Sequence, residues 1–317
     1  MAPAEDDISI EEKRVYAGTA GRTDAYVATG NGVVRVALSA DKVGAFDMVA
    51  REPARDVAVL PRDDESDLVG IATADGLRVA LVGDDPEFEP IDADTGAAVA
   101  AVAASVHDGA FLVAGEEGEI DRVAVEGGDG APTAAAVTRV GSVSEPRAID
   151  GPLVAAADGV YRVTEGDGAA AATDASAARA LTAVGLDDAR DVAGAGMPLA
   201  ATGSGLYWLG NGWMTAREGA AEAVAADGDG HAMAVLDGDL LVHAGDASGT
   251  EAVAWDAETW GETELPVDED PVALGYGPGI SVAVTAAGTL CVDAGDGWRH
   301  QVVGVRDVAG VALAVVE

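Results

Sequence analysis

The stretch "ATGSGLYWLGNGW" (Ala201–Trp213) alternates short apolar segments with glycine-containing turns. Loops rich in glycine can also bind phosphate, but a phosphate loop needs a following helix whose N-terminal amides meet the anion. Here residues typical of β-strands follow the glycines. We therefore interpret the stretch as successive turns of an antiparallel sheet, because glycine supplies the positive φ that tight hairpin turns require.

The same strand–turn–strand unit recurs along the whole chain. The turn glycines are Gly32, Gly76, Gly118, Gly159, Gly205, Gly238 and Gly288, at intervals of 33 to 50 residues. A further apolar segment precedes most of these hairpins, such as "ARDVAVL" from Ala54, and a fourth strand can follow each of them, such as "GWMTA" from Gly212. Four short strands in each unit of roughly 43 residues are typical of a β-propeller blade.

The repeat predicts an all-β, seven-bladed β-propeller with four-stranded blades. Six blades are continuous in sequence, at roughly 54–92, 97–141, 145–184, 189–218, 220–265 and 271–303. The C-terminal "VRDVAGVALAVV" and residues 25–51 would form the seventh, and "EKRVYAGT" from Glu12 competes for a place in it. Such closure removes the exposed sheet edges. We expect an acidic tail over residues 1–12 and a single propeller domain over residues 13–317.

Two alternatives to this fold and to its strands are open. A pair of β-sandwich domains would also be all-β, but no linker or shift in composition divides the chain. The segment "DASAARALTAVG" from Asp174 is rich enough in alanine to form a short helix. Its place in the repeat favours the outer strand of a blade.

The charge of the chain is extreme, with 56 acidic and 18 basic residues and a formal net charge of -38. Only Lys13 and Lys42 are lysines. Such a charge repels nucleic acid and anionic membranes, so we expect neither as a partner. Molar salt shortens the screening length to about 3 Å and relieves the self-repulsion. We therefore expect a halophilic protein. No signal peptide or long apolar run is evident, so we expect it in a high-salt cytoplasm.

Two resemblances follow from these segments. "IEEKRVYAGT", "AYVATGNGVVRV" and "ARDVAVL" together resemble an uncharacterised haloarchaeal family of β-propeller proteins, over the whole chain. That resemblance implies the propeller fold and no established activity. "GNGW" (Gly210–Trp213) and "GDGW" (Gly295–Trp298) are similar to the end of the Asp-box turn of sialidase-type propellers. The Asp box stabilises a hairpin between outer strands, so this similarity implies no catalysis.

Arginine recurs at the start of the predicted innermost strands. The four residues are Arg55, Arg147, Arg190 and Arg306, and in three cases aspartate follows directly. Innermost strands line the central channel of a propeller, so the sequence predicts a ring of guanidinium groups at one mouth of it. Such a ring could bind a small anionic ligand or an acidic peptide. Alternatively, each arginine pairs with a carboxylate of a neighbouring blade and locks the ring.

Other candidate sites are weaker. Trp255 and Trp260 lie in the irregular segment "AWDAETWGETE" and are candidates for an exposed patch that contacts a partner protein. His231 and His243 would project from opposite faces if Asp237-Gly238 forms a two-residue hairpin, which argues against a shared metal ion. We expect no metal and no cofactor. Carboxylates are too numerous for the sequence to single out a catalytic pair.

The leading functional prediction is a non-catalytic scaffold that binds a protein or a small ligand on the face that carries the arginines. The alternative is an enzyme of the glycoside hydrolase or lactonase type, with carboxylates at the channel mouth. A buried carboxylate pair or a cluster of metal ligands at that mouth would favour the enzyme.

Overall fold

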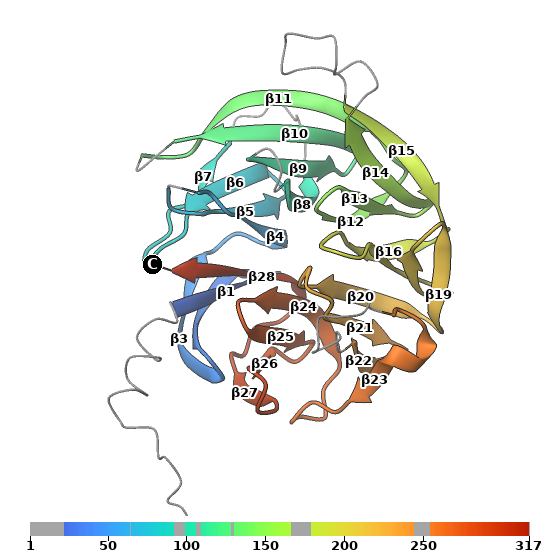
Figure 1. Ribbon diagram of the computed structural model, residues 1–317. Helices are drawn as coiled ribbons and strands as arrows, with labels where there is room; N and C mark the ends of the chain where they lie inside the picture. The colour runs from blue at the N-terminus through green and yellow to red at the C-terminus, as the bar shows by residue number, and fades with distance from the viewer. Residues whose placement is uncertain are drawn as a thin grey trace, which may run out of the picture.

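The structure is a computed structural model that describes residues 22–63, 65–91, 99–105, 109–127, 130–165, 179–243 and 254–316. Seven four-stranded antiparallel sheets stand in a ring around a central axis (Figure 1). In each sheet one strand faces the axis and the other three follow outward. The prediction of a seven-bladed propeller is therefore confirmed. We number the blades from the first that is continuous in sequence.

The first four blades run from the innermost to the outermost strand in chain order. Blade 1 consists of β4 (Ala54–Leu60), β5 (Leu68–Thr73), β6 (Gly76–Leu81) and β7 (Glu89–Pro90). Blade 2 consists of β8 (Val99–Ser105), β9 (Ala110–Gly115), β10 (Glu119–Glu126) and β11 (Thr133–Ser142). Blade 3 consists of β12 (Pro146–Asp150), β13 (Leu153–Ala156), β14 (Gly159–Glu165) and β15 (Arg179–Gly185). Blade 4 consists of β16 (Ala189–Ala193), β17 (Leu199–Thr202), β18 (Gly205–Leu209) and β19 (Trp213–Glu218).

The remaining three blades complete the ring. Blade 5 consists of β20 (Ala221–Ala226), β21 (Ala232–Leu236), β22 (Asp239–His243) and β23 (Trp260–Thr263). Blade 6 consists of β24 (Pro271–Gly277), β25 (Ile280–Thr285), β26 (Thr289–Asp293) and β27 (Arg299–Val302). Blade 7 consists of β28 (Val308–Val316), β1 (Arg22–Thr29), β2 (Gly32–Ser39) and β3 (Lys42–Ala50).

Blade 7 closes the ring by joining the two ends of the described chain. Its innermost strand β28 pairs antiparallel with β1, from Arg22 opposite Val316 to Thr29 opposite Val308. The predicted closure by N- and C-terminal segments is thereby confirmed, with one strand from the C-terminal segment and three from the N-terminal one. The competing segment "EKRVYAGT" and the predicted acidic tail lie outside the described residues.

The hairpin between the second and third strands of a blade has a recurring chemistry. In blades 7, 1 and 4 a buried threonine ends the second strand, and its hydroxyl donates to the carbonyl oxygen of the turn glycine at 2.8 to 3.0 Å. Gly32 adopts a φ of +134°, and an added Cβ would lie 2.0 Å from the Ala50 carbonyl oxygen. Gly205 lacks the expected positive φ, but its added Cβ would lie 2.6 Å from the Arg217 carbonyl oxygen. Close approach of the fourth strand therefore selects glycine there.

The apolar core lies between adjacent blades. Leucine, valine and alanine side chains from neighbouring sheets form clusters, as around Leu60 and Phe111 between blades 1 and 2. An added Cβ at Gly70 would lie 2.8 Å from the Phe111 ring, so small residues let the sheets approach each other. The alanine-rich segment from Asp174 forms strand β15 where it is described, as the repeat predicts. The one helical turn among the described residues is η1 (Ala257–Thr259), and none of their helices is long and apolar enough to cross a membrane.

Candidate functional site

Each innermost strand carries a β-bulge close to its beginning. In all seven blades the register between the innermost and the second strand shifts by one residue, so that one residue of the innermost strand has no partner. The bulged residues are Arg55, Ala100, Arg147, Arg190, Glu222, Val272 and Ala309. A bulge redirects a side chain relative to the regular pleat. It therefore defines structurally equivalent positions around the channel.

This equivalence shows that the prediction for Arg306 is wrong. The bulged residue of blade 7 is Ala309, three residues after Arg306, and Arg306 is exposed outside the channel lining. The similarity of "VRDV" to "ARDV" is misleading. Asp307 has a φ of +54° and precedes β28, just as Asp188, with a φ of +50°, precedes β16. Asp307 thus corresponds to a turn residue of blade 4 and not to the aspartate of its strand.

The other three predicted arginines lie together at a central hollow of about 710 Å³ that the seven innermost strands enclose. The side chains of Arg55, Arg147 and Arg190 are 37%, 34% and 35% exposed, so solvent and ligands reach them. They belong to blades 1, 3 and 4. The structure therefore brings together three of the four predicted residues.

Each of these arginines also contacts the next blade. Arg55 pairs with Glu116 of blade 2 at 2.5 Å, and Arg147 pairs with Asp188 at the start of blade 4 at 2.6 Å. Arg190 lies 3.8 Å from Asp188 and 4.0 Å from Glu222 of blade 5, beyond hydrogen-bonding distance. Within the described chain, hydrogen bonds engage only the Nη1 atoms of Arg55 and Arg147. Both predicted roles are thus geometrically compatible, because inter-blade pairing leaves guanidinium donors free.

Carboxylates also line the channel, and two of them directly follow an arginine along the innermost strand. They were not predicted as site residues from the sequence. Asp56 accepts hydrogen bonds from the Val57 amide at 2.8 Å and from the Val102 amide of blade 2 at 3.0 Å. Asp191 repeats the arrangement three blades away, with the amides of Val192 and of Val224 in blade 5 at 2.9 and 2.8 Å. Each carboxylate thereby links its blade to the next by hydrogen bonds, and we call these two links the Asp56 and Asp191 clamps. The sequence feature that could have identified these carboxylates is the aspartate that follows arginine in "ARDV".

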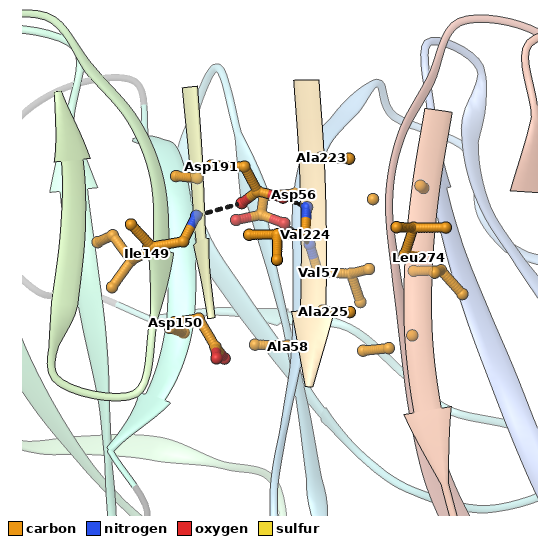
Figure 2. A pocket seen from close by; sticks show the side chains of 18 of the residues that line it. Asp56, Val57, Ala58, Ile149, Asp150, Asp191, Ala223, Val224, Ala225 and Leu274 are labelled. Carbon is orange, nitrogen blue, oxygen red and sulfur yellow. Dashed lines mark hydrogen bonds between the residues drawn. The ribbon is translucent and has the colours of Figure 1, made fainter. Parts of the chain in front are cut away.

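A third carboxylate lies further along the channel. The Gly194 amide of blade 4 donates to Asp150 of blade 3 at 2.6 Å. In Figure 2, Asp56 and Asp191 share one level of the channel, and Asp150 lies nearer the level of Ala58 and Ala225. The three carboxylates and the three arginines line the same hollow.

Burial controls the ionisation of these carboxyl groups. Removal from water raises the pKa of Asp56 to about 7, and the amides of Val102 and Val57 offset only part of that effect. The pKa of Asp191 rises to about 7 for the same reason, and the pKa of Asp150 is also raised by burial. The negative charge of Asp191 adds to the rise at Asp56. Perturbed ionisable groups in a hollow are a frequent mark of functional sites.

The family of the chain follows from its sequence together with this architecture. The model of the HVO_0234-like beta propeller family matches residues 9–314. The chain belongs to this family. No curated protein matches it.

Solved structures share the fold of this HVO_0234-like propeller at low sequence identity. A functionally unknown protein from Desulfotomaculum acetoxidans has a TM-score of 0.61 and 11% identity, over 93% of this chain and 99% of that one. YCF48 bound to a D1 peptide gives 0.54 and 14%, over 93% and 97% of the two chains. AztD from Citrobacter koseri gives 0.52 and 10%, over 94% and 99%. These likenesses concern the fold alone.

The prediction that Trp255 and Trp260 form an exposed aromatic patch is wrong. Trp255 is 4% exposed and Trp260 is 2% exposed, and both belong to the core between blades 4 and 5. Trp255 stacks on the buried His243 ring with centroids 4.0 Å apart and planes 7° apart. The two nitrogens of His243 face the carbonyl oxygens of Gly230 and Ala254 at 2.8 and 2.7 Å. This polar anchor holds the irregular segment inward, which its composition did not indicate.

The predicted register of the His231–His243 hairpin is confirmed. Leu236 pairs with Asp239 and Ala232 with His243, as the two-residue Asp237-Gly238 turn requires. His231 is instead exposed and lies 2.6 Å from an Asp227 carboxylate oxygen. Among the described residues no three His, Cys, Asp or Glu side chains form a metal-binding group. The turns "GNGW" and "GDGW" both join a third to a fourth strand, β18 to β19 and β26 to β27.

Proposed function

We propose that this HVO_0234-like propeller is a binding protein that takes the anionic group of a small ligand or acidic peptide at the arginine mouth of its channel. The observation that carries the proposal is the convergence of Arg55, Arg147 and Arg190 on one accessible hollow. Basic residues number only 18 in this chain. Three of them at equivalent positions present guanidinium groups where an anion can enter.

The pairing of these arginines leaves them able to bind. To the residues that the structure describes, Arg190 makes only long ion pairs, and Arg55 and Arg147 donate through a single nitrogen each. A guanidinium group has five N–H donors in a planar fork that fits a carboxylate or a phosphate with two parallel hydrogen bonds. An incoming anion would therefore use donors that the fold leaves free, and the inter-blade pairs would hold the fork in place.

The net charge sets the conditions under which binding occurs. A net charge of -38 repels an anion at long range in dilute buffer. At molar salt the screening length is about 3 Å, so the distant carboxylates no longer oppose the approach. We infer that the protein binds its ligand in a high-salt cytoplasm.

Isothermal titration calorimetry in molar NaCl tests this proposal, with inorganic phosphate and a hexaglutamate peptide as probes. The wild type should bind at least one of them. The R55A/R147A/R190A variant should lose at least about tenfold in affinity, since each charge-assisted hydrogen bond contributes on the order of 1 kcal/mol or more. The matched control is R306A, which removes an arginine outside the channel and should bind as the wild type does. Equal binding by both variants and the wild type would refute the proposal.

A hydrolase of the glycoside or lactone type is a second candidate, favoured by one observation. Asp56 and Asp191 line the hollow with pKa values of about 7, which suits a general acid or base near neutral pH. A screen of nitrophenyl glycosides and of lactones tests this candidate. Turnover that D56N or D191N abolishes would support it, and turnover that survives in both would count against these carboxyl groups as the catalysts.

A further inference from the structure

The channel wall is divided into a charged side and an apolar side. All three channel aspartates and all three channel arginines come from blades 1, 3 and 4, and Glu222 of blade 5, near Arg190, is the one further charged residue among the described residues of the lining. Blades 6 and 7 line the same hollow with Val272, Leu274, Tyr276, Val311 and Leu313. In the ring order, blade 7 faces blades 3 and 4 across the channel. A ligand in the hollow therefore contacts charges along one flank and apolar side chains along the other.

The charged side is itself layered along the channel. Arginine occupies the bulge at the beginning of the strand, and aspartate follows it in blades 1 and 4. A molecule that enters from the strand beginnings meets guanidinium groups first. The carboxylates of Asp56 and Asp191 come next, and Leu274 lies deeper on the opposite flank (Figure 2).

The carboxylates of this second layer are without a cationic partner within the described residues. Among the described residues, Asp56 and Asp191 accept hydrogen bonds only from backbone amides, one on each oxygen. A carboxylate offers about four lone-pair positions, so every oxygen can accept a further donor. A half-buried negative charge that lacks a cation is costly, and a cationic group of a ligand would offset that cost.

We propose that the channel binds a zwitterion with an apolar side chain, of the size of an amino acid or a dipeptide. Its carboxylate would meet the arginines, its ammonium group would meet Asp56 and Asp191, and its side chain would lie against Leu274, Val311 and Leu313. The hollow of about 710 Å³ lies within the usual range of ligand pockets. This inference rests on the proposed function, because it assigns the anionic group to the same arginines.

The layering discriminates against simpler ligands. A plain anion with an apolar tail meets the arginines but leaves the carboxylates of Asp56 and Asp191 without a cationic partner. A plain amine that enters from the strand beginnings passes three guanidinium groups before it meets those carboxylates, and it leaves the guanidinium groups without an anionic ligand. A zwitterion engages both layers at once, and the narrow channel screens these ion pairs less than bulk water does.

The test compares three probes on the wild-type protein by calorimetry in molar NaCl. L-leucine carries both charges, 4-methylpentanoate is leucine without its amino group, and isoamylamine is leucine without its carboxylate. Leucine should bind at least about tenfold more tightly than either analogue. This comparison needs no variant, so it does not depend on the folding of a mutant.

Two variants refine the comparison. D56N should reduce leucine affinity about tenfold or more and leave that of 4-methylpentanoate nearly unchanged, because only leucine carries the ammonium group. The matched control D307N alters the aspartate of the third Arg-Asp pair, which lies outside the channel lining, and should leave both affinities unchanged. Circular dichroism verifies that each variant is folded.

The outcomes separate this inference from the proposed function. Binding of 4-methylpentanoate as tight as that of leucine would refute the zwitterion and leave the anion site standing. Binding of phosphate or hexaglutamate without any binding of leucine would also refute the zwitterion. If none of the probes binds, both proposals fail.

Discussion

Neighbouring innermost strands are held together by different interactions on the two sides of the channel. Every innermost strand presents unpaired backbone groups to the channel, and neighbouring innermost strands must be held together. On the charged side, Asp56 and Asp191 satisfy amides of their own blade and of the next one. On the apolar side, β24 and β28 pack directly, and an added Cβ at Gly275 would lie 2.8 Å from Leu313. Hydrogen-bonded clamps thus hold one side and close contact holds the other.

The difference teaches where the molecule can accommodate a ligand. Close contact at Gly275 leaves no room for an added methyl group, whereas the clamped blades leave charged groups exposed to the hollow. The two arrangements meet at Gly310 of blade 7, where an added Cβ would lie 2.9 Å from Oδ1 of Asp56. Blade 7 therefore closes the ring next to the Asp56 clamp of blade 1.

The largest expected effect is that of salt, which acts on the exterior and not on the channel. From low to molar NaCl the unfolding temperature should rise by roughly 10 °C or more, because screening relieves repulsion among 56 acidic residues. Differential scanning calorimetry measures this rise. The temperature difference between wild type and a channel variant such as D191A should stay nearly constant, since buried groups are screened less. A flat response of the wild type would contradict the prediction of a halophilic protein.

The next largest effect is the loss of stability that follows removal of the Asp191 clamp. Asp191→Ala leaves the amides of Val192 and Val224 without their acceptor, and an unsatisfied buried donor costs about 1–3 kcal/mol. We expect a loss of roughly 2 kcal/mol or more in the free energy of unfolding, measured by denaturant titration. D307N serves as the control and should change stability by less than about 0.5 kcal/mol. Equal stability of D191A and D307N would show that the clamp is dispensable.

The pH dependence of stability distinguishes the two sides further. The folded-state pKa of Asp56 and Asp191 is about 7, above the value of about 4 in an unfolded chain. Between these values the folded state retains protons that the unfolded state releases. The contribution of these two groups to stability therefore falls as the pH rises from 4 to 7.

Thermal unfolding from pH 4 to pH 8 measures this linkage. The D56N/D191N variant should lose less stability than the wild type across the window, because asparagine does not titrate. L313A, altered on the apolar side, should retain the wild-type slope. Parallel curves for the wild type and D56N/D191N would contradict the assigned ionisation.

The smallest effect concerns packing on the apolar side. Gly275→Ala should destabilise the protein by about 1 kcal/mol, because the new methyl group meets the end of a flexible leucine side chain. In G275A/L313A the steric conflict is absent, so the double variant should lose less than the sum of the single ones in a double-mutant cycle. Gly261→Ala is the matched control, since no atom lies within 4 Å of its added Cβ. Additive losses would show that the two residues do not compete for space.

Local patterns in the sequence predicted most of the fold. The glycine turns, the spacing of the hairpins and the apolar alternation fixed seven blades and the closing blade, because each of these is a property of neighbouring residues. The hairpin from Ala232 to His243 was even predicted in its register, since a two-residue turn leaves one pairing. Of the four arginines predicted at the channel from their place at the beginning of a repeat, three line it.

The errors arose where distant segments decide the outcome. Arg306 matched the pattern "RDV", but the bulge that orients an arginine into the channel depends on pairing between β28 and β1, at opposite ends of the chain. Trp255 and Trp260 were expected at the surface, but contact with His243 and blade 4 buries them. No local pattern encodes either contact.

The sequence by itself determined the number of blades, their hairpins, the negative charge and the family to which the chain belongs. Only the tertiary structure decided which arginines reach the channel, that Asp56, Asp150 and Asp191 line the same hollow, and that blades 6 and 7 supply apolar side chains to it. The physical reason is closure of the ring. Hairpins form from residues close in sequence, whereas the channel exists only when seven strands, spread over more than 250 residues, meet around one axis.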